Sequence, residues 1–220
     1  MEVDLNKINR EMFIKFLKKN SIRHDIIQDR AVIPDFVFNQ EERCSIINYF
    51  RFHDIFFWRE GGIENVTLWE NPGRIRDVLF EFSMLFPDSD YDSFASLESR
   101  GFILGGIFSY EYAKPLIAIR KHKKAHDRLP GLKHHYINWK NEKETIYLFK
   151  NDTGLKRSIF IDDILDSGRS LKACEEVLKM QNTGIAGAFY LADASPPDVK
   201  ESFSFPVKSL LRLSDIRSVL

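Results

Sequence analysis

One segment, residues 158–172, constrains the fold of this 220-residue chain more than any other. From Ser158 to Ile161 runs a short, mostly apolar stretch of the kind found in a central β-strand. Two adjacent carboxylates, Asp162 and Asp163 (the acidic pair), follow it directly. The chain then turns through small residues into a segment whose apolar positions recur about every 3.6 residues, which predicts a helix. Strand, acidic pair and helix therefore meet at the carboxyl end of a buried strand.

The start of this helix is suited to binding a phosphate. The first turn of a helix leaves backbone N–H groups unpaired and carries a partial positive charge. The residues of this turn are Asp166, Ser167, Gly168, Arg169 and Ser170. The acidic pair would lie beside the turn and accept hydrogen bonds from sugar hydroxyls. The alternative is an ordinary strand, turn and helix in which Asp166 caps the helix.

The whole segment resembles the signature with which type I phosphoribosyltransferases bind phosphoribosyl pyrophosphate (PRPP), in which an apolar run, two acids and a small-residue turn follow one another. The resemblance implies an α/β fold with a central, mostly parallel sheet and helices on both faces. It also implies that PRPP is bound by the acidic pair and the residues after it. These residues are Asp162, Asp163, Ile164, Leu165, Ser167, Gly168, Arg169 and Ser170.

A second strand, loop and helix is predicted for residues 94–106. The Ser-Arg-Gly-Phe run that begins at Ser99 resembles the pyrophosphate loop of adenine phosphoribosyltransferases. The resemblance implies a cis peptide between Glu98 and Ser99. It also implies that Glu98, Ser99 and Arg100 bind pyrophosphate, with charge-assisted hydrogen bonds from Arg100. The alternative for Arg100 is a surface ion pair with Glu98 or Glu111.

The segment from Pro115 to Lys124 reads as a strand that ends in a basic cluster. Within it, Arg120, Lys121 and Lys124 resemble the start of the mobile loop that closes over PRPP in adenine and orotate phosphoribosyltransferases, which implies that they bind pyrophosphate. Such a loop would run from Lys121 to Asn141 and exclude water from the reaction. The alternatives are a solvated face or a nucleic-acid patch. Nucleic acid is the weaker of these, because no aromatic side chains are interleaved in the basic run.

Further strands are predicted at residues 145–149, 186–191 and 207–211, and a helix at 74–85 after a turn at 71–73. Alternating strands and helices imply a parallel-rich sheet covered on both faces. The ligand site of such a sheet lies at the carboxyl ends of its strands, where the three segments described above also end.

Several residues bear on the acceptor base. Trp58 and Arg59 stand where the adenine enzymes have a purine-stacking aromatic residue and its neighbour, and a core aromatic is an equal alternative for Trp58. Asp166 is the candidate catalytic residue, as general base or partner of purine N7. An acid there resembles hypoxanthine-guanine phosphoribosyltransferases, whereas adenine enzymes have a small residue. After Tyr136, where the adenine family has a Glu, this chain has Trp139. Adenine is thus the first expectation, with a 6-oxopurine or a specialised heterocycle as alternatives.

The resemblance runs from about Asp54 to Leu213. It implies an enzyme that uses PRPP, a nucleobase and Mg²⁺, with the metal bound through PRPP oxygens and without direct protein ligands. It also implies a homodimer. A non-catalytic PRPP-binding regulator is the other class considered, but residues 1–40, with one predicted helix, are short of a winged helix. We therefore expect an N-terminal helical extension at 1–40 and a phosphoribosyltransferase domain at 41–220.

Composition excludes several other classes. With 44% apolar and 29% charged residues, the chain is typical of a soluble globular protein with one sizeable core. Its 32 basic and 32 acidic residues cancel, so no overall field recruits nucleic acid or an anionic membrane. Cys44 and Cys174 lie far apart, which fits a reducing compartment. We expect neither a signal peptide nor a membrane-spanning segment. We expect a cytoplasmic protein with no membrane or nucleic-acid partner.

Overall fold

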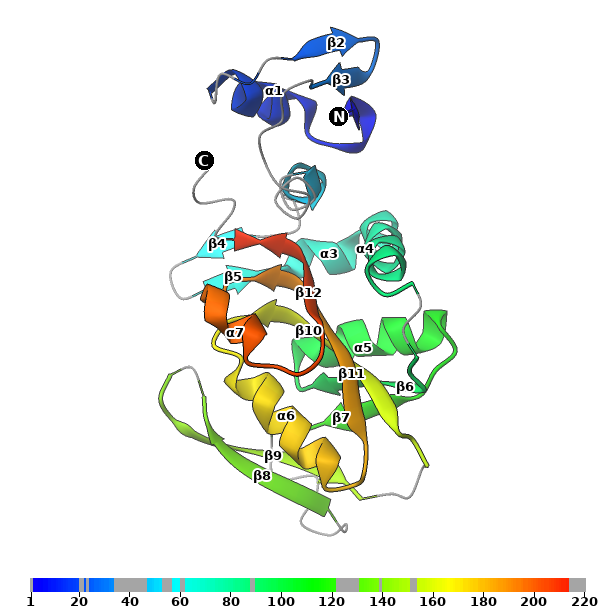
Figure 1. Cartoon of the computed structure of the whole chain (residues 1–220), viewed down its shortest axis with the longest axis vertical. Coiled ribbons are helices and arrows are strands. Elements are labelled where there is room, and N and C mark those ends of the chain that lie inside the picture. The colour runs from blue at the N-terminus through cyan, green and yellow to red at the C-terminus, as the bar shows by residue number, and fades with distance from the viewer. Residues whose placement is uncertain are drawn as a thin grey trace. The chain divides into compact units, whose positions relative to one another are not determined.

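The structure is a computed structural model (Figure 1). It describes residues 2–19, 22, 24–33, 47–52, 57–59, 62–87, 90–121, 131–138, 140–150 and 154–213. The chain divides into a first unit, Met1–Val78 with Leu210–Leu220, and a second unit, Leu79–Ser209. The domain boundary expected at residue 40 lies outside the described residues.

The central sheet has five strands in the order β12-β11-β10-β6-β7. Strand β10 pairs in parallel with β11 and with β6, and β6 pairs in parallel with β7. The strands are β6 (Ser93–Leu97), β7 (Leu116–Ile119), β10 (Arg157–Leu165), β11 (Gly184–Asp193) and β12 (Val207–Arg212). Because four of them run in parallel, their carboxyl ends meet at one edge of the sheet.

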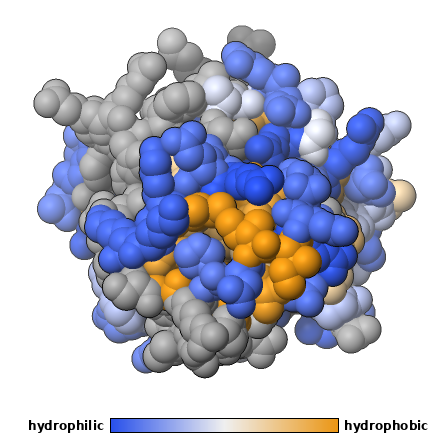
Figure 2. All heavy atoms as spheres, turned by 90° about the horizontal axis from the view of Figure 1, so that it is seen from above, coloured by the Kyte–Doolittle hydropathy of each residue, from blue (hydrophilic) through white to orange (hydrophobic). Residues whose placement is uncertain are grey.

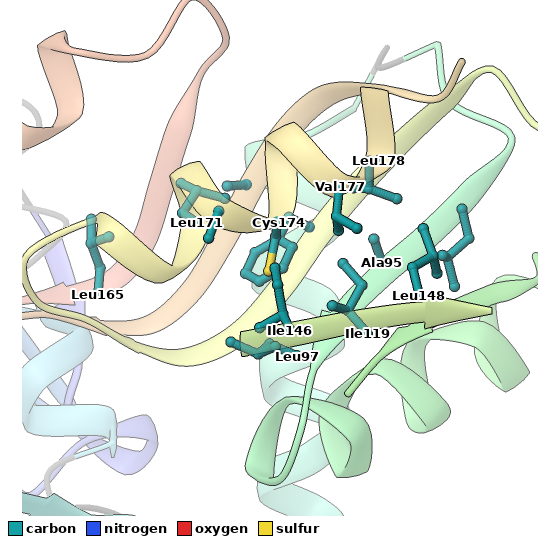
Figure 3. Packing of buried hydrophobic residues seen from close by; sticks show 14 of the residues in the cluster. Ala95, Leu97, Ile119, Ile146, Leu148, Leu165, Leu171, Cys174, Val177 and Leu178 are labelled. Carbon is teal, nitrogen blue, oxygen red and sulfur yellow. The ribbon is translucent and has the colours of Figure 1, made fainter. Parts of the chain in front are cut away.

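Helices α5 (Arg100–Glu111) and α6 (Arg169–Lys179) cover opposite faces of this sheet. Successive side chains of a strand point to opposite faces. Phe94 of β6 lies against Phe108 of α5, with ring centroids 5.8 Å apart, whereas its neighbour Ala95 packs in the cluster that contains the apolar face of α6. Figure 3 shows this cluster, with the labelled side chains of α6 directed toward the strands. The expected α/β sheet with helices on both faces is confirmed.

The apolar stripe of α6 also packs against a β-hairpin. Strands β8 (Gly131–Ile137) and β9 (Lys143–Phe149) are antiparallel, and Ile146, Leu148, Leu132 and Tyr136 belong to the same cluster as α6. Side chains along β8 alternate between exposed and half-buried positions, as expected for a strand with one packed face. Of the segment 121–141 expected to form a mobile loop, residues 131–137 are a packed β-strand, while closure of the segment over PRPP stays a prediction. Residues 122–130 lie outside the described residues.

Helix α4 (Pro72–Leu85) begins earlier than its apolar pattern indicated. The Asn71 Oδ1 atom accepts hydrogen bonds from the N–H groups of Gly73 and Arg74, at 3.0 and 3.2 Å. The turn expected at 71–73 is therefore the capped first turn of the helix. Proline suits this position because its nitrogen has no hydrogen to leave unpaired.

The first unit contains a small antiparallel sheet in the order β1-β3-β2. Its strands are β1 (Glu2–Asp4), β2 (Asp25–Ile27) and β3 (Arg30–Val32). Between β1 and β2 the chain forms the short 3-10 helix η1 (Leu5–Lys7) and then the predicted helix, α1 (Arg10–Lys19). Their shared core comprises Val3, Leu5, Phe13, Phe16, Leu17, Ala31, Ile33 and Phe50. Strands of three residues are too short to show a periodic pattern, so the sequence did not predict this sheet.

The same unit holds the hairpin β4 (Phe57–Arg59) and β5 (Gly62–Glu64), and the helix α3 (Val66–Glu70).

Figure 2 shows apolar residues grouped among hydrophilic ones on one face of the molecule. In this unit Ile26 and Ile27 of β2 are 42% and 62% exposed. Among the described helices, none is long and apolar enough to cross a membrane.

Candidate active site

The acidic pair lies at the carboxyl end of β10, beside the loop that leaves β6. The Arg100 Nε atom is 2.9 Å from Asp163 Oδ2, and the Asp163 side chain is only 8% exposed. Since β6 and β10 are adjacent parallel strands, residues 63 positions apart meet at this edge of the sheet. The structure thus joins the first two predicted segments, and Arg100 forms an ion pair with Asp163 of the acidic pair.

The loop at 98–100 also approaches the acidic pair through its backbone. A Cβ atom added at Gly101 would lie 2.9 Å from Asp162 Oδ1, too close for any other residue without movement. The peptide between Glu98 and Ser99 is cis, so that prediction is confirmed. Ser99 is exposed at the N-cap of α5 and makes no side-chain capping bond. The N-terminal end of α5 is therefore held against the acidic pair.

The surroundings of Asp162 disfavour the charged form of its carboxyl group. Burial raises the pKa of Asp162 well above its ordinary value, and the negative charge of Asp163 raises it further, while Lys121 opposes the shift. Burial likewise raises the pKa of Cys174 and of Tyr190, the residue opposite Asp162 in β11. The carboxyl groups of the acidic pair present several hydrogen-bonding oxygens to adjacent hydroxyl groups.

The basic residues after β7 are held by two further carboxylates. The Lys121 N–H donates to Glu98 Oε2 at 2.9 Å, and Arg120 Nη2 is 3.4 Å from Glu98 Oε1. The Lys121 Nζ atom is 3.8 Å from Glu144 Oε2, and Glu144 also accepts a hydrogen bond from the hydroxyl of Tyr136. Arg120 and Lys121 thus lie beside the loop at 98–100. Lys124, predicted with them, lies outside the described residues.

The turn at 166–170 (the phosphate turn) has a backbone that only glycine adopts readily. Gly168 has a φ of +69° and is the N-cap of α6, where no side-chain capping bond is made. Asp166 is exposed and does not cap the helix, which removes the capping alternative. Ser167 and Ser170 are half-buried in the same turn. The first turn of a helix leaves backbone N–H groups without intrahelical partners, and the glycine at the N-cap of α6 has no side chain to accept from them.

The other residues predicted to contact PRPP have different surroundings. Arg169 is directed to the β8–β9 turn, where its Nη1 atom donates to Asn138 O and Asn141 Oδ1, both at 3.0 Å. The Leu165 side chain is buried in the cluster of α6, so only its backbone can face a ligand. Ile164 is half-buried.

The predicted base-binding residues belong to the first unit. Trp58 and Arg59 are in β4, paired with Ile63 and Gly62 of β5. The acidic pair belongs to the second unit. Trp139 lies outside the described residues.

The structure adds one group of residues that the sequence reasoning missed. Asp193, at the carboxyl end of β11, is 1% exposed and accepts hydrogen bonds from Ser195 N–H and Oγ, at 2.9 and 2.5 Å. The Lys200 Nζ atom of α7 (Pro197–Glu201) is 2.7 Å from Asp193 Oδ2. The Ala194 N–H donates to Leu165 O at 2.7 Å, which places the group beside the phosphate turn. An acid directly after an apolar strand was the available signal, and it is the signal that marked the acidic pair.

Comparison with known proteins gives a consistent result. The chain is 31% identical over 148 residues to the adenine phosphoribosyltransferase of Nitrosopumilus maritimus, a match that covers 65% of the chain and 84% of that enzyme. The solved enzyme of Giardia lamblia, complexed with 9-deazaadenine, superimposes with a TM-score of 0.61 at 20% identity and covers 74% of this chain and 96% of its own. That of Trypanosoma brucei, with AMP, pyrophosphate and ribose-5-phosphate, has a TM-score of 0.60 at 16% identity, over 75% and 79% of the two chains. No protein-family model matches the chain.

The solved structures share the fold of this chain, whose acidic pair lies on the middle strand of the parallel sheet, and this is the fold expected of the type I phosphoribosyltransferases. Such a protein is a transferase. With 31% identity over most of the Nitrosopumilus enzyme, the chain belongs to the adenine phosphoribosyltransferase family.

Proposed function

We propose that this protein transfers the phosphoribosyl group of PRPP to adenine, forming AMP and releasing pyrophosphate. The observation that carries the proposal is the 2.9 Å contact between Arg100 and Asp163, because it brings a pyrophosphate-type loop and a ribose-type acidic pair to one edge of the sheet. Membership of the adenine family supports the choice of base.

PRPP would lie across the carboxyl ends of β6 and β10. Asp162 and Asp163 form hydrogen bonds with the ribose hydroxyls through their carboxyl oxygens. The phosphate turn holds the 5′-phosphate through backbone N–H groups at the start of α6. Ser99 and Arg100 bind pyrophosphate together with Arg120, Lys121 and Lys124 from the basic segment. The proposed site thus has carboxyl groups for the ribose hydroxyls and cationic side chains for the pyrophosphate of PRPP.

The reaction exchanges one bond for another at the ribose. The bond between ribose C1 and the pyrophosphate oxygen breaks, the oxygen keeps the electron pair, and C1 acquires oxocarbenium character. Adenine N9 then bonds to C1 and loses its proton to a general base. Asp166 is the candidate for this base, since it is exposed at the phosphate turn and free of a capping role.

Mg²⁺ fits this arrangement as a partner of the substrate. Among the described residues, no group of three or more His, Cys, Asp or Glu side chains could hold a metal ion. The acidic pair nevertheless presents the hard oxygen donors that Mg²⁺ prefers, and this ion is often bound mainly through substrate phosphates. When bound, it would offset the charge of the leaving pyrophosphate.

The remaining expectations are part of the same proposal. Trp58 and Arg59 bind the base in this proposal, with the Trp58 ring stacked on the purine. The domains are an N-terminal extension at 1–40 and a catalytic domain at 41–220. The enzyme acts in purine salvage as a cytoplasmic homodimer.

Pyrophosphate release tests the proposal. The protein is incubated with Mg²⁺ and PRPP and, separately, with adenine, hypoxanthine, guanine, xanthine, uracil or orotate. Adenine is expected to give the highest kcat/KM, with AMP as the product. Turnover with hypoxanthine or guanine in place of adenine would reassign the base. Binding of PRPP without turnover on any of these bases would indicate a non-catalytic PRPP-binding regulator instead of an enzyme.

A further inference from the structure

Glu98 introduces a negative charge into a loop that would bind a polyanion. Its neighbours in this loop, Ser99 and Arg100, suit pyrophosphate as a hydrogen-bonding hydroxyl and a cation. A carboxylate at that place repels pyrophosphate unless it is engaged elsewhere. The side chain of Glu98 is in fact 18% exposed and directed at the chain that follows β7.

Glu98 contacts that chain through both its backbone and its side chain. Its N–H donates to Ile119 O at 2.9 Å, at the end of β7. Its Oε2 atom accepts from the N–H of Lys121 at 2.9 Å, and its Oε1 atom lies 3.4 Å from Arg120 Nη2. One carboxylate thus engages two consecutive residues, a backbone donor of one and the charge of the other.

Arg120 is held from the opposite side as well. Its N–H donates to Tyr147 O at 2.9 Å, and the Tyr147 N–H donates to Arg120 O at 2.8 Å, which forms a bridge to β9. The Nε atom of Arg120 is buried and finds no acceptor within the described part of the chain. The bridge to β9 fixes the backbone of Arg120, and the contact with Glu98 fixes one end of its guanidinium group. Together they fix the orientation of the Nε–H donor.

We infer that Glu98 is a positioning residue, which does not touch pyrophosphate but directs Arg120 and Lys121 toward it. The inference rests on the proposed function, since it assumes that these two cations bind pyrophosphate. Glu98 would then favour pyrophosphate binding through its neighbours, although its own negative charge repels the ligand.

Positioning and simple electrostatics predict opposite results when Glu98 is replaced. If Glu98 only repelled the ligand, removal of its charge would tighten pyrophosphate binding. If Glu98 positions Arg120 and Lys121, the same change weakens binding, because the Arg120 guanidinium loses the carboxylate opposite it and the Lys121 backbone loses the acceptor of its N–H group.

Two variants separate the contacts of this carboxylate. In Glu98→Gln the amide oxygen still accepts from the Lys121 N–H, but the charge opposite Arg120 is lost. In Glu98→Ala both contacts are lost. Glu111→Gln removes one negative charge from an exposed site at the end of α5 and is the matched control.

The Kd of magnesium pyrophosphate is measured by calorimetry for each protein, and KM for PRPP and for adenine by turnover. Glu98→Gln is expected to weaken pyrophosphate binding about two- to fivefold, as for loss of a partly exposed ion pair. Glu98→Ala is expected to weaken it about tenfold or more. KM for PRPP rises in parallel, KM for adenine stays unchanged, and Glu111→Gln binds as the wild type does.

Hydrogen exchange of the Lys121 amide gives a readout that needs no ligand. Exchange is expected to be faster in Glu98→Ala and unchanged in Glu98→Gln. Equal or tighter pyrophosphate binding by Glu98→Ala overturns the inference. Should thermal unfolding show that Glu98→Ala does not fold, equal binding by Glu98→Gln overturns it. Failure of the wild type to bind pyrophosphate overturns the proposed function together with the inference, whereas failure of the variants alone leaves the proposed function intact.

Discussion

Arg100 and Asp163 form an ion pair, with the Nε and Oδ2 atoms 2.9 Å apart, that ties the start of α5 to the end of β10. The Arg100 side chain is 40% exposed and the Asp163 side chain is 8% exposed. The pair therefore lies at the surface edge of the sheet, with its acid largely shielded from water. A cation and an acid held in this way are preorganised for a ligand that carries both phosphate and hydroxyl groups.

Replacement of Asp163 with Asn should weaken PRPP binding. The amide keeps the size of the side chain but removes the charge that Arg100 faces and half of its acceptors. We expect the Kd for PRPP to rise about tenfold or more, as for loss of a charge-assisted hydrogen bond. Calorimetric titration measures it, with Glu111→Gln as the control. An unchanged Kd would show that the acidic pair is not the ribose contact.

Gly168→Ala and Gly154→Ala form a matched pair for the packing of the phosphate turn. Both glycines have a φ near +70°, so each substitution carries the same backbone cost, about 1–2 kcal/mol. Only at Gly168 would the new Cβ also lie 2.8 Å from Val199 Cγ1, while at Gly154 nothing lies within 4 Å. Urea unfolding should show a loss at Gly168 that is larger by about 1–3 kcal/mol. Equal losses in the free energy of unfolding would mean that α7 moves away from the new Cβ atom without an energetic cost.

Arg169→Ala should loosen the turn between β8 and β9. The substitution removes two hydrogen bonds of 3.0 Å, to Asn138 O and Asn141 Oδ1. Because Arg169 is exposed, we expect a modest loss of about 1 kcal/mol in the free energy of unfolding. Hydrogen exchange should quicken at residues 140–142. Arg169→Lys, which keeps the charge but not the forked donor, is expected to behave like the Ala variant. Wild-type exchange rates in the Ala variant would contradict this role.

The stability of the protein should fall with rising pH through the titration of Asp162. Its pKa is raised in the folded state, so above the ordinary value of 3.8 the unfolded chain loses a proton that the folded chain keeps. The free energy of unfolding then declines, by up to about 1.4 kcal/mol per pH unit, until the folded pKa is passed.

Asp162→Asn tests this pH dependence. The variant has no proton to lose at this position, so its stability curve should be flatter than that of the wild type in the acid range. Urea unfolding between about pH 4 and 8 gives both curves. Parallel curves would mean that Asp162 titrates at its ordinary pKa in the folded protein.

Much of the second unit could be predicted because its signals are local. The apolar run before Asp162 is long enough to identify β10, and the helical spacing after Gly168 identifies α6. Strand β9 was predicted at residues 145–149, but β8 was not, because it has apolar side chains only on the face that packs against the cluster of α6, such as Leu132 and Tyr136. Their burial depends on a helix more than thirty residues away in the sequence.

By itself, the sequence determined which residue types stand at the end of each strand: the acidic pair after β10, the Ser-Arg-Gly turn after β6 and the basic pair after β7. These follow from periodicity and backbone preference, which act within one segment. Only the tertiary structure decided their partners. Parallel pairing of β6 with β10 and β7 set Arg100 against Asp163 and Glu98 against Lys121. Contacts between distant segments depend on sheet order and strand register, which no single segment specifies.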